Sequence, residues 1–89
     1  MVYYVYILRS LKDGSFYVGQ AQDLEERLQR HNSGRSRYTN KKKPWEMVYS
    51  EECATRELAQ KREKEIKGKK SKEYIEYLLR NMPRQEGGT

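Results

Sequence analysis

The sequence is short of metal-binding and disulfide-forming residues, with one cysteine and one histidine in 89 residues. A single thiol, Cys53, cannot close a disulfide within the chain, and the chain lacks the other cysteines or histidines that a zinc site needs. Such usage is typical of a reducing compartment, and we expect a cytoplasmic protein. We interpret Cys53 as a small packed residue at a strand end, because the one candidate base, His31, lies far off in sequence.

The sequence also lacks any long apolar run. Its first ten residues, MVYYVYILRS, are apolar over too short a stretch for a membrane span or a signal peptide, so we expect no membrane association. Only 35% of the residues are hydrophobic, enough for one modest core. No repeat or linker divides the chain, which predicts one domain over residues 1–82 and a disordered tail at 83–89.

Positive charge is in excess: Lys and Arg number 19 against 13 Asp and Glu, a net charge of +6. This balance favours polyanionic partners, nucleic acid before anionic membranes. A basic stripe without acids begins on a predicted helix and continues into a polar loop, where Tyr38 and Trp45 could stack on bases. A merely solvated loop is the alternative. The basic residues of the stripe are Arg27, Arg30, Arg35, Arg37, Lys41, Lys42 and Lys43.

Three strands are predicted from the apolar pattern. Residues 2–8 are β-branched or aromatic throughout, as in a central strand, and Asp13-Gly14 then marks a turn into a second strand at 15–19. The third, at 45–51, alternates, and the side chains on one of its faces are Trp45, Met47 and Tyr49. The first two strands leave room only for a hairpin, which excludes a parallel doubly wound sheet and indicates an α+β domain.

Three helices are predicted from caps and 3.6-residue periodicity. Asp23 caps the first, which runs to about Asn32. Thr55 caps a long second helix that ends near Gly68, and Ser71 begins a third. The apolar face of the third helix carries Ile75, Leu78, Leu79 and Met82.

The hairpin is expected to place Tyr6 and Tyr17 on one face of the sheet. With an even-length loop, even-numbered side chains of the first strand share a face with odd-numbered ones of the second. A two-residue turn at Asp13-Gly14 would put Tyr17 opposite Ser10, roughly 13 Å from Tyr6 at about 3.3 Å per residue. The pattern predicts the shared face and leaves the distance open.

Two helices carry candidate functional side chains. Arg27 and His31 lie one turn apart beside the apolar stripe of the first helix, where an arginine is suited to hold a phosphate through two parallel hydrogen bonds. A solvated arginine and a half-buried histidine are the alternative.

The second helix offers two carboxylates, Glu63 and Glu65, on opposite edges of its apolar stripe. Periodicity does not choose between them, and a solvated ion pair is the usual role of either. Arg62 falls within the stripe, where it either extends to solvent or pairs with an acid or a phosphate. The stripe is formed by Leu58, Ala59 and Ile66.

Two tyrosine triplets, Tyr4-Val5-Tyr6 and Tyr17-Val18-Gly19, precede the helix segments DLEERLQRH and REKEIKG. In this combination the sequence resembles the GIY-YIG (URI) nuclease superfamily, and within it the small stand-alone bacterial predicted endonucleases, over about residues 3–80. It departs from the pattern at Tyr4, where the first signature usually has glycine.

The resemblance implies a three-stranded antiparallel sheet flanked by helices, and a hydrolase site that uses a divalent metal, Mg²⁺ or Mn²⁺. It favours Glu63 over Glu65 as the metal ligand. In many relatives a further polar residue follows the metal-binding helix, for which Asn81 is a candidate. The catalytic residues that the resemblance implies are Tyr6, Tyr17, Arg27, His31 and Glu63.

These residue types suit phosphodiester hydrolysis. Arg27 would offset charge on the phosphorus oxygens, and a tyrosine would hold or deprotonate the attacking water. A phenol with a pKa near 10 needs a nearby cation to act as a base, and both Tyr6 and Tyr17 stay candidates.

Three functions compete. The first is an endonuclease acting on DNA with low sequence specificity, in repair, recombination or processing of foreign DNA, with RNA left open as a substrate. The second is a catalytically silent nucleic-acid-binding module of the same fold. The third is a scaffold subunit recruited by a protein partner. The sequence does not predict the oligomeric state.

Overall fold

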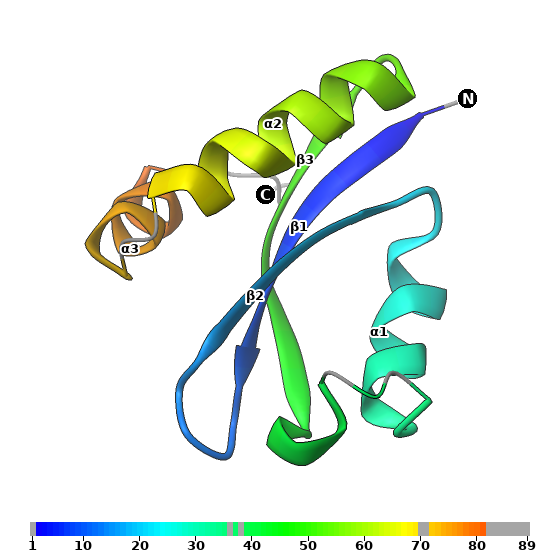
Figure 1. The fold of residues 1–89 in the computed structure, drawn as a ribbon, viewed down its shortest axis with the longest axis vertical. Helices are drawn as coiled ribbons and strands as arrows, with labels where there is room; N and C mark the ends of the chain where they lie inside the picture. Colours follow the sequence, from blue (N-terminus) through cyan, green and yellow to red (C-terminus); the bar gives the residue numbers. More distant parts are fainter. Residues whose placement is uncertain (1, 36, 38, 70–71, 82–89) are drawn as a thin grey trace, which may run out of the picture.

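The computed structural model describes residues 2–35, 37, 39–69 and 72–81, which form a three-stranded sheet with helices on both faces (Figure 1). The order and the α+β class are as predicted. The predicted helix start at Ser71, Met82 and the predicted tail at 83–89 lie outside the described residues. The elements are β1 (Tyr3–Ser10), β2 (Phe16–Ala21), α1 (Leu24–Asn32), a short 3₁₀ helix (Asn40–Lys42), β3 (Trp45–Cys53), α2 (Arg56–Lys69) and α3 (Lys72–Arg80).

The sheet is antiparallel with the strand order β2-β1-β3, which confirms the first strand as the central one. Side chains from both faces of β1 are buried, among them Val5, Tyr6 and Ile7. Its run of β-branched and aromatic residues fits a strand that packs on both sides. None of the described helices has the length and apolar character needed to span a bilayer.

The β1–β2 loop is longer than a two-residue turn. The buried Ser10 hydroxyl accepts hydrogen bonds from the backbone N–H groups of Lys12 and Asp13, and the Ser10 N–H donates to the Ser15 carbonyl. The resulting register pairs Leu8, rather than Ser10, with Tyr17, and Tyr6 with Gly19. Tyr6 and Tyr17 are therefore diagonal neighbours on one face, since side chains two positions apart share a face.

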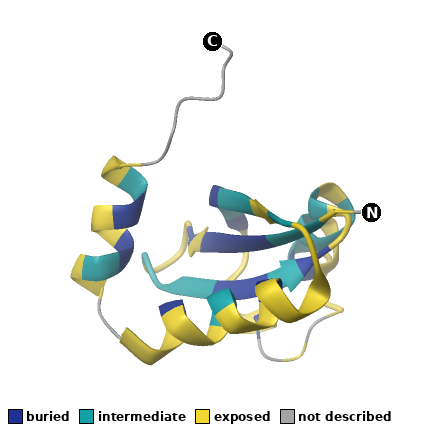
Figure 2. Ribbon diagram, turned by 90° about the horizontal axis from the view of Figure 1, so that it is seen from above, coloured by how far each residue is buried: buried dark blue, intermediate teal, exposed yellow. Residues whose placement is uncertain are grey.

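Each face of the sheet carries its own core cluster. Figure 2 colours the buried residues of the strands and helices dark blue. Beneath α2 and α3 the buried residues are mainly aliphatic: Val5, Ile7, Val18, Tyr49, Ala59, Ile66, Ile75 and Leu78. Beneath α1 they are Tyr6, Leu8, Ala21 and Trp45, with Tyr17, Leu24, Leu28 and Met47 partly buried around them.

The predicted alternation of β3 is wrong at Tyr49. A register shift between Ile7 and Leu8 makes Ile7 pair with Tyr49 and Leu8 with Met47, so that β3 has one extra residue at Val48. Such a bulge reverses the side of the sheet that later side chains face. Met47 consequently packs beneath α1, whereas Tyr49 packs beneath α2 and α3.

The predicted helix caps of α1 and α2 are confirmed. The Glu26 N–H donates to Asp23 Oδ1 at 3.0 Å, and the Leu58 N–H donates to Thr55 Oγ1 at 3.1 Å. At the other end of α1, the Asn32 side chain binds both the N–H and the carbonyl of Trp45. This pair of bonds fixes α1 to the start of β3.

The predicted stripe of α2 is wrong at Leu58, which is 50% exposed. At about 100° per residue, Ala59 and Ile66 point in nearly the same direction, roughly 80° or more from Leu58, and only this pair faces the core. Arg62 lies beside it and pairs with Glu51 on β3 at 2.5 Å. Burial opposes its charge, but hydrogen bonds to Glu51, Tyr74 and Glu65, together with the charge of Glu51, outweigh burial and raise the Arg62 pKa.

Candidate active site

Aromatic side chains and one histidine meet on the α1 face of the sheet. The Tyr6 and Tyr17 ring centroids are 6.4 Å apart, and His31 of α1 lies 4.8 Å from the Tyr17 ring. The Trp45 ring is 6.3 Å from that of Tyr17. The register of β1 and β2 thus brings together Tyr6 and Tyr17, which the sequence placed on one face without a distance, and the packing of α1 and β3 adds His31 and Trp45.

Gly19 makes room for the Tyr6 ring. A Cβ atom at position 19 would lie 2.6 Å from the Tyr6 hydroxyl oxygen and 2.7 Å from its Cζ. Tyr6 is only 1% exposed, so its ring is enclosed on its other sides and has little freedom to move away. The glycine of the second triplet therefore serves close approach between a strand backbone and an aromatic ring.

Tyr6, His31 and Thr39 form a buried hydrogen-bonded chain. The Tyr6 hydroxyl lies 3.2 Å from His31 Nε2, and His31 Nδ1 lies 2.7 Å from Thr39 Oγ1. Burial and the neighbouring Tyr17 raise the pKa of Tyr6 to about 12, against the opposing charge of Arg27. Burial and the charges of Arg27 and Arg30 lower the pKa of His31. Near pH 7 the pair is a neutral phenol beside a neutral imidazole.

One end of the Arg27 guanidinium group is hydrogen-bonded, and another of its N–H donors is buried without a partner in the described part of the chain. Its NH1 group donates to the Gln20 carbonyl at 3.2 Å. Its buried Nε has no hydrogen-bond partner among the described residues, and the nearest Glu26 oxygen is 3.8 Å away. Because an unsatisfied buried donor is costly, this N–H is suited to an oxygen of a bound anion.

Glu63 reaches β2 from the face of the sheet opposite to Arg27. Its Oε1 accepts a hydrogen bond from Gln20 Nε2 at 3.0 Å, and its Oε2 lies 2.7 Å from Lys67 Nζ. Gln20 thus joins the two candidates, because its carbonyl binds Arg27 and its side chain binds Glu63. The candidate site wraps around the β2 edge, with tyrosines, histidine and arginine on the α1 side and the carboxylate on the α2 side.

The chain matches a known protein family. A family model described as the GIY-YIG catalytic domain matches residues 2–76. The chain belongs to the GIY-YIG family. GIY-YIG domains belong to endonucleases, which act on nucleic acid and generally use divalent metals.

The relatives of this GIY-YIG chain are small bacterial proteins. The UPF0213 protein SSP2268 of Staphylococcus saprophyticus is 46% identical over 66 residues, which are 73% of this chain and 79% of that protein. A UPF0213 protein of Streptococcus pneumoniae is 37% identical over 82 residues, 91% of this chain and 82% of that protein. The solution structure of the UPF0213 protein BH0048 of Bacillus halodurans has a TM-score of 0.58 and 35% identity, covering 92% of this chain and 86% of that one.

A divalent metal ion in this candidate site would have one carboxylate ligand, Glu63. Among the described residues no group of three or more His, Cys, Asp and Glu side chains is placed to hold a metal ion. Glu63 alone still fits Mg²⁺, which keeps several waters and is commonly bound through one or two carboxylates. Gln20 already orients one oxygen of Glu63, while Lys67, whose side chain is 51% exposed, is able to leave the other.

A polar pocket of about 240 Å³ lies beside Arg27, on the side away from Tyr17 along β2. Two arginines line it, Arg27 and Arg56, and the remaining lining residues are Tyr3, Gln20, Ala21, Gln22 and Gln60. On α2, Arg56, Gln60, Glu63 and Lys67 follow one another at spacings of four, three and four, which places them along one side of the helix. Positive charge and amide groups thus continue along β2 from the candidate site.

Apart from the half-buried Arg27, the described members of the basic stripe are exposed, but several of them are paired. Arg30 bonds Glu26 at 3.1 Å, and Lys42 lies 3.7 Å from Asp13 of the β1–β2 loop. Arg35 donates to Ser33. The other described members, all exposed, are Arg37, Lys41 and Lys43, and Tyr38 lies outside the described residues. Binding of nucleic acid by this stripe stays a prediction.

Two other candidates point elsewhere. Asn81, which directly follows α3, donates to the carbonyl of Tyr77 in that helix, and Glu65 pairs with Arg62 at 3.2 Å. Cys53 packs against the core at the end of β3, and burial raises its pKa, as expected of a packed thiol rather than a nucleophile.

Sequence reasoning missed three residues of the site: Gln20, Thr39 and Lys67. The spacing of four between Glu63 and Lys67 was the one available signal, since such pairs meet on a helix. Gln20 and Thr39 had none, because their partners come from distant segments.

Proposed function

We propose that this protein is a metal-dependent endonuclease that hydrolyses phosphodiester bonds of nucleic acid, with DNA as the substrate and little sequence specificity. The observation that carries the proposal is the convergence of Arg27 and Glu63 on Gln20, beside the pair Tyr6 and Tyr17. The arginine and the carboxylate act on the phosphate rather than on the bases. Because the phosphate carries no sequence information, we expect weak sequence preference.

The proposed roles follow from charge. A divalent metal on Glu63 would supply Lewis-acid stabilisation of the charge that develops on the phosphate. Arg27 binds a non-bridging phosphate oxygen through its unpartnered Nε–H. Preorganised donors of this kind act most strongly where charge develops in the transition state.

Tyr6 and His31 provide a route for the proton of the attacking water. As the water oxygen forms a bond to phosphorus, its proton passes to the Tyr6 oxygen, and the Tyr6 hydroxyl proton passes to His31 Nε2. The neutral imidazole accepts it, and Thr39 holds the ring in place through Nδ1. The bond from phosphorus to the leaving oxygen breaks in the same step, and the leaving oxygen takes up a proton from bulk water. Tyr17, half-buried beside both rings, orients the water or the phosphate.

The experiment compares wild type with Arg27→Ala and Glu63→Gln on supercoiled plasmid, single-stranded DNA and branched DNA, with Mg²⁺, Mn²⁺ or chelator. Loss of one charge-stabilising donor lowers the rate by about 10²–10³-fold, which we expect for Arg27→Ala. Glu63→Gln should lower it at least as much, and chelator should stop cleavage. Glu65→Gln is the matched control, because it changes a carboxylate two residues away that pairs with Arg62.

Cleavage that survives unchanged in Glu63→Gln would sink the assignment of the metal ligand. Absence of cleavage by wild type, together with salt-sensitive binding that persists in Glu63→Gln, would instead support the silent binding module.

A further inference from the structure

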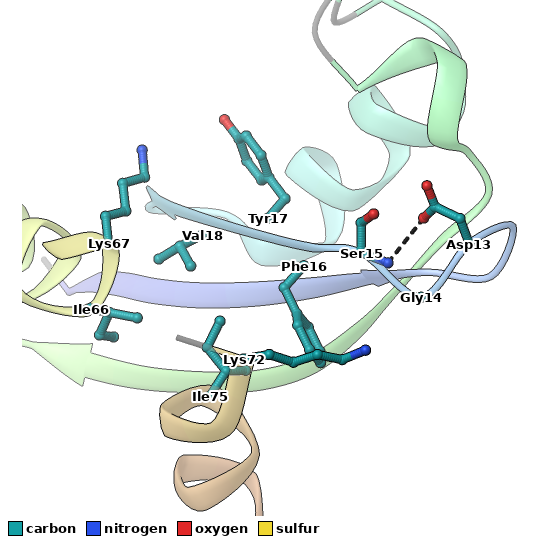
Figure 3. Close-up of a pocket in the computed structure, with 10 residues that line it drawn as sticks. All are labelled: Asp13, Gly14, Ser15, Phe16, Tyr17, Val18, Ile66, Lys67, Lys72 and Ile75. Atoms are coloured by element: carbon teal, nitrogen blue, oxygen red, sulfur yellow. Dashed lines mark hydrogen bonds between the residues drawn. The ribbon is translucent and has the colours of Figure 1, made fainter. Parts of the chain in front are cut away.

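A groove of about 880 Å³ opens next to the candidate active site, between β2, α2 and α3 (Figure 3). Its apolar wall is formed by Phe16 and Val18 of β2, Ile66 of α2 and Ile75 of α3. Two cations, Lys67 and Lys72, stand at its rim. An apolar recess of this size with a few charged groups is typical of a ligand-binding site.

The groove begins at the candidate active site. Lys67 lines the groove, lies 2.7 Å from Glu63 Oε2 and stands over the Tyr17 ring at 5.9 Å. Tyr17 lines the groove as well. A nucleic-acid strand with one phosphate at Glu63 therefore has its adjoining nucleotide at the entrance of the groove.

The charges around the groove favour an anion. Among the described residues of its lining Asp13 is the one acid, and that carboxylate is already engaged, by the Ser15 N–H at 2.9 Å and by Lys42 at 3.7 Å. Lys72 on α3 and Lys67 on α2 carry the positive charge. A flat apolar ring with a phosphate beside it is the chemistry that matches this lining.

We infer that this groove binds an unpaired nucleobase adjoining the cleaved phosphodiester, with the base against Phe16 and a flanking phosphate at Lys72. The inference rests on the proposed function, since it requires a nucleic-acid strand at Glu63. Inside a duplex both faces of a base are covered by its neighbours, so a base that enters the groove must be unpaired or extruded. Substrates with a single-stranded segment are thus favoured.

The first experiment measures binding without turnover, in Glu63→Gln and without metal. The affinity for oligo-thymidine is compared with the affinity for an abasic strand of the same length and phosphate count. The comparison is made once with Phe16 in place and once with Phe16→Leu added. Stacking on one aromatic side chain corresponds to a difference of about 5- to 150-fold. We expect Phe16→Leu to remove that factor from the thymidine strand and to leave the abasic strand unchanged.

The second experiment tests the phosphate contact. In Lys72→Ala the slope of log affinity against log salt should fall by about 0.7, the value for one contact to a single strand. The matched control is Lys61→Ala, which removes an exposed lysine from the side of α2 opposite Glu63. Lys72 is exposed, so its variant is expected to fold, and thermal unfolding of each variant checks this.

The outcomes separate this inference from the proposed function. Equal weakening of both strands by Phe16→Leu, an equal slope change in Lys72→Ala and Lys61→Ala, or dimerisation that Lys72→Ala abolishes would each overturn the groove as a base site. If the wild type cleaves DNA but Phe16→Leu does not change the preference for oligo-thymidine over the abasic strand, the endonuclease proposal stands and the groove is rejected. If Phe16→Leu removes that preference but the wild type cleaves nothing, the groove stands and the endonuclease proposal is rejected.

Discussion

The face of the sheet beneath α2 and α3 and the face beneath α1 are built from different kinds of side chain. The first packs mainly aliphatic residues, such as Ile7 and Ile66. The second buries the aromatic residues Tyr6 and Trp45, and it also buries His31 and Thr39, whose polar groups are hydrogen-bonded. Aliphatic packing tolerates rearrangement, whereas a buried polar network specifies one arrangement. A single strand, β1, therefore serves stability with one set of side chains and site geometry with the alternate set.

Tyr6→Phe tests the polar face and should have the largest effect. Without the hydroxyl the proton route to His31 is lost, and we expect the cleavage rate to fall by about 10²–10⁴-fold. The free energy of unfolding should fall by about 1–3 kcal/mol, because the substitution leaves the buried His31 nitrogen without its hydrogen-bond partner. Single-turnover cleavage and urea unfolding measure the two quantities. A rate loss accounted for by the unfolded fraction would contradict the proposal.

Ile7→Ala, at the neighbouring position on the opposite face, should show the reverse pattern. Truncation of a fully buried isoleucine costs about 2–5 kcal/mol of unfolding free energy, seen in the denaturant midpoint. Because Ile7 does not contact the site, the rate per folded molecule should stay within a few-fold of wild type. A rate loss matching that of Tyr6→Phe would show that the two faces are not separable.

Gly19→Ala should produce a smaller effect on both quantities. The added Cβ overlaps the enclosed Tyr6 ring, and overpacking of this kind costs about 1–3 kcal/mol of unfolding free energy. The cleavage rate should fall as well, because Tyr6 must shift from His31. Gly68→Ala is the control: outside its chain neighbours and its own helix backbone, no atom of the described residues lies within 4 Å of the added Cβ, and alanine in a helix stabilises by about 0.5–1 kcal/mol. Equal effects of the two substitutions would exclude the steric explanation.

Acidification should give the smallest effect, through His31. Its folded pKa lies below the ordinary value of 6.5, so between that value and the folded pKa the unfolded chain binds more protons. Stability contributed by the neutral ring is thus complete above about pH 6.5 and is lost as pH falls through this window. His31 is the one histidine in the sequence, so its NMR titration gives the folded pKa directly.

His31→Asn is the matching variant for this test. It should make the unfolding free energy less dependent on pH in that window. A folded midpoint above 6.5 would contradict a buried, neutral imidazole.

The strands, the helix caps and the shared face of Tyr6 and Tyr17 were predictable because they depend on local chemistry and on alternation along a strand. The distance between the two rings was not, since it depends on the β1–β2 loop, which Ser10 closes with its own hydroxyl. Tyr49 could not be placed either, because a bulge in β3 has no periodic signal.

The sequence named candidate residues for the site, but it named neither Gln20, Thr39 and Lys67 nor any of the contacts between them. The resemblance selected Glu63 over Glu65, and in the structure Glu63 points to β2 whereas Glu65 pairs with Arg62. The role of Gln20 depends on two segments that reach β2 from opposite faces, which no local pattern encodes.

Trp45 has a practical consequence for the study of this protein. It is the one tryptophan in the sequence and is 4% exposed. Its indole N–H donates to the Thr39 carbonyl, and its ring lies 6.3 Å from that of Tyr17. Tryptophan fluorescence of the unlabelled chain, excited selectively over that of its tyrosines, therefore originates beside the proposed reaction centre, and a change in this emission reports directly on what happens there.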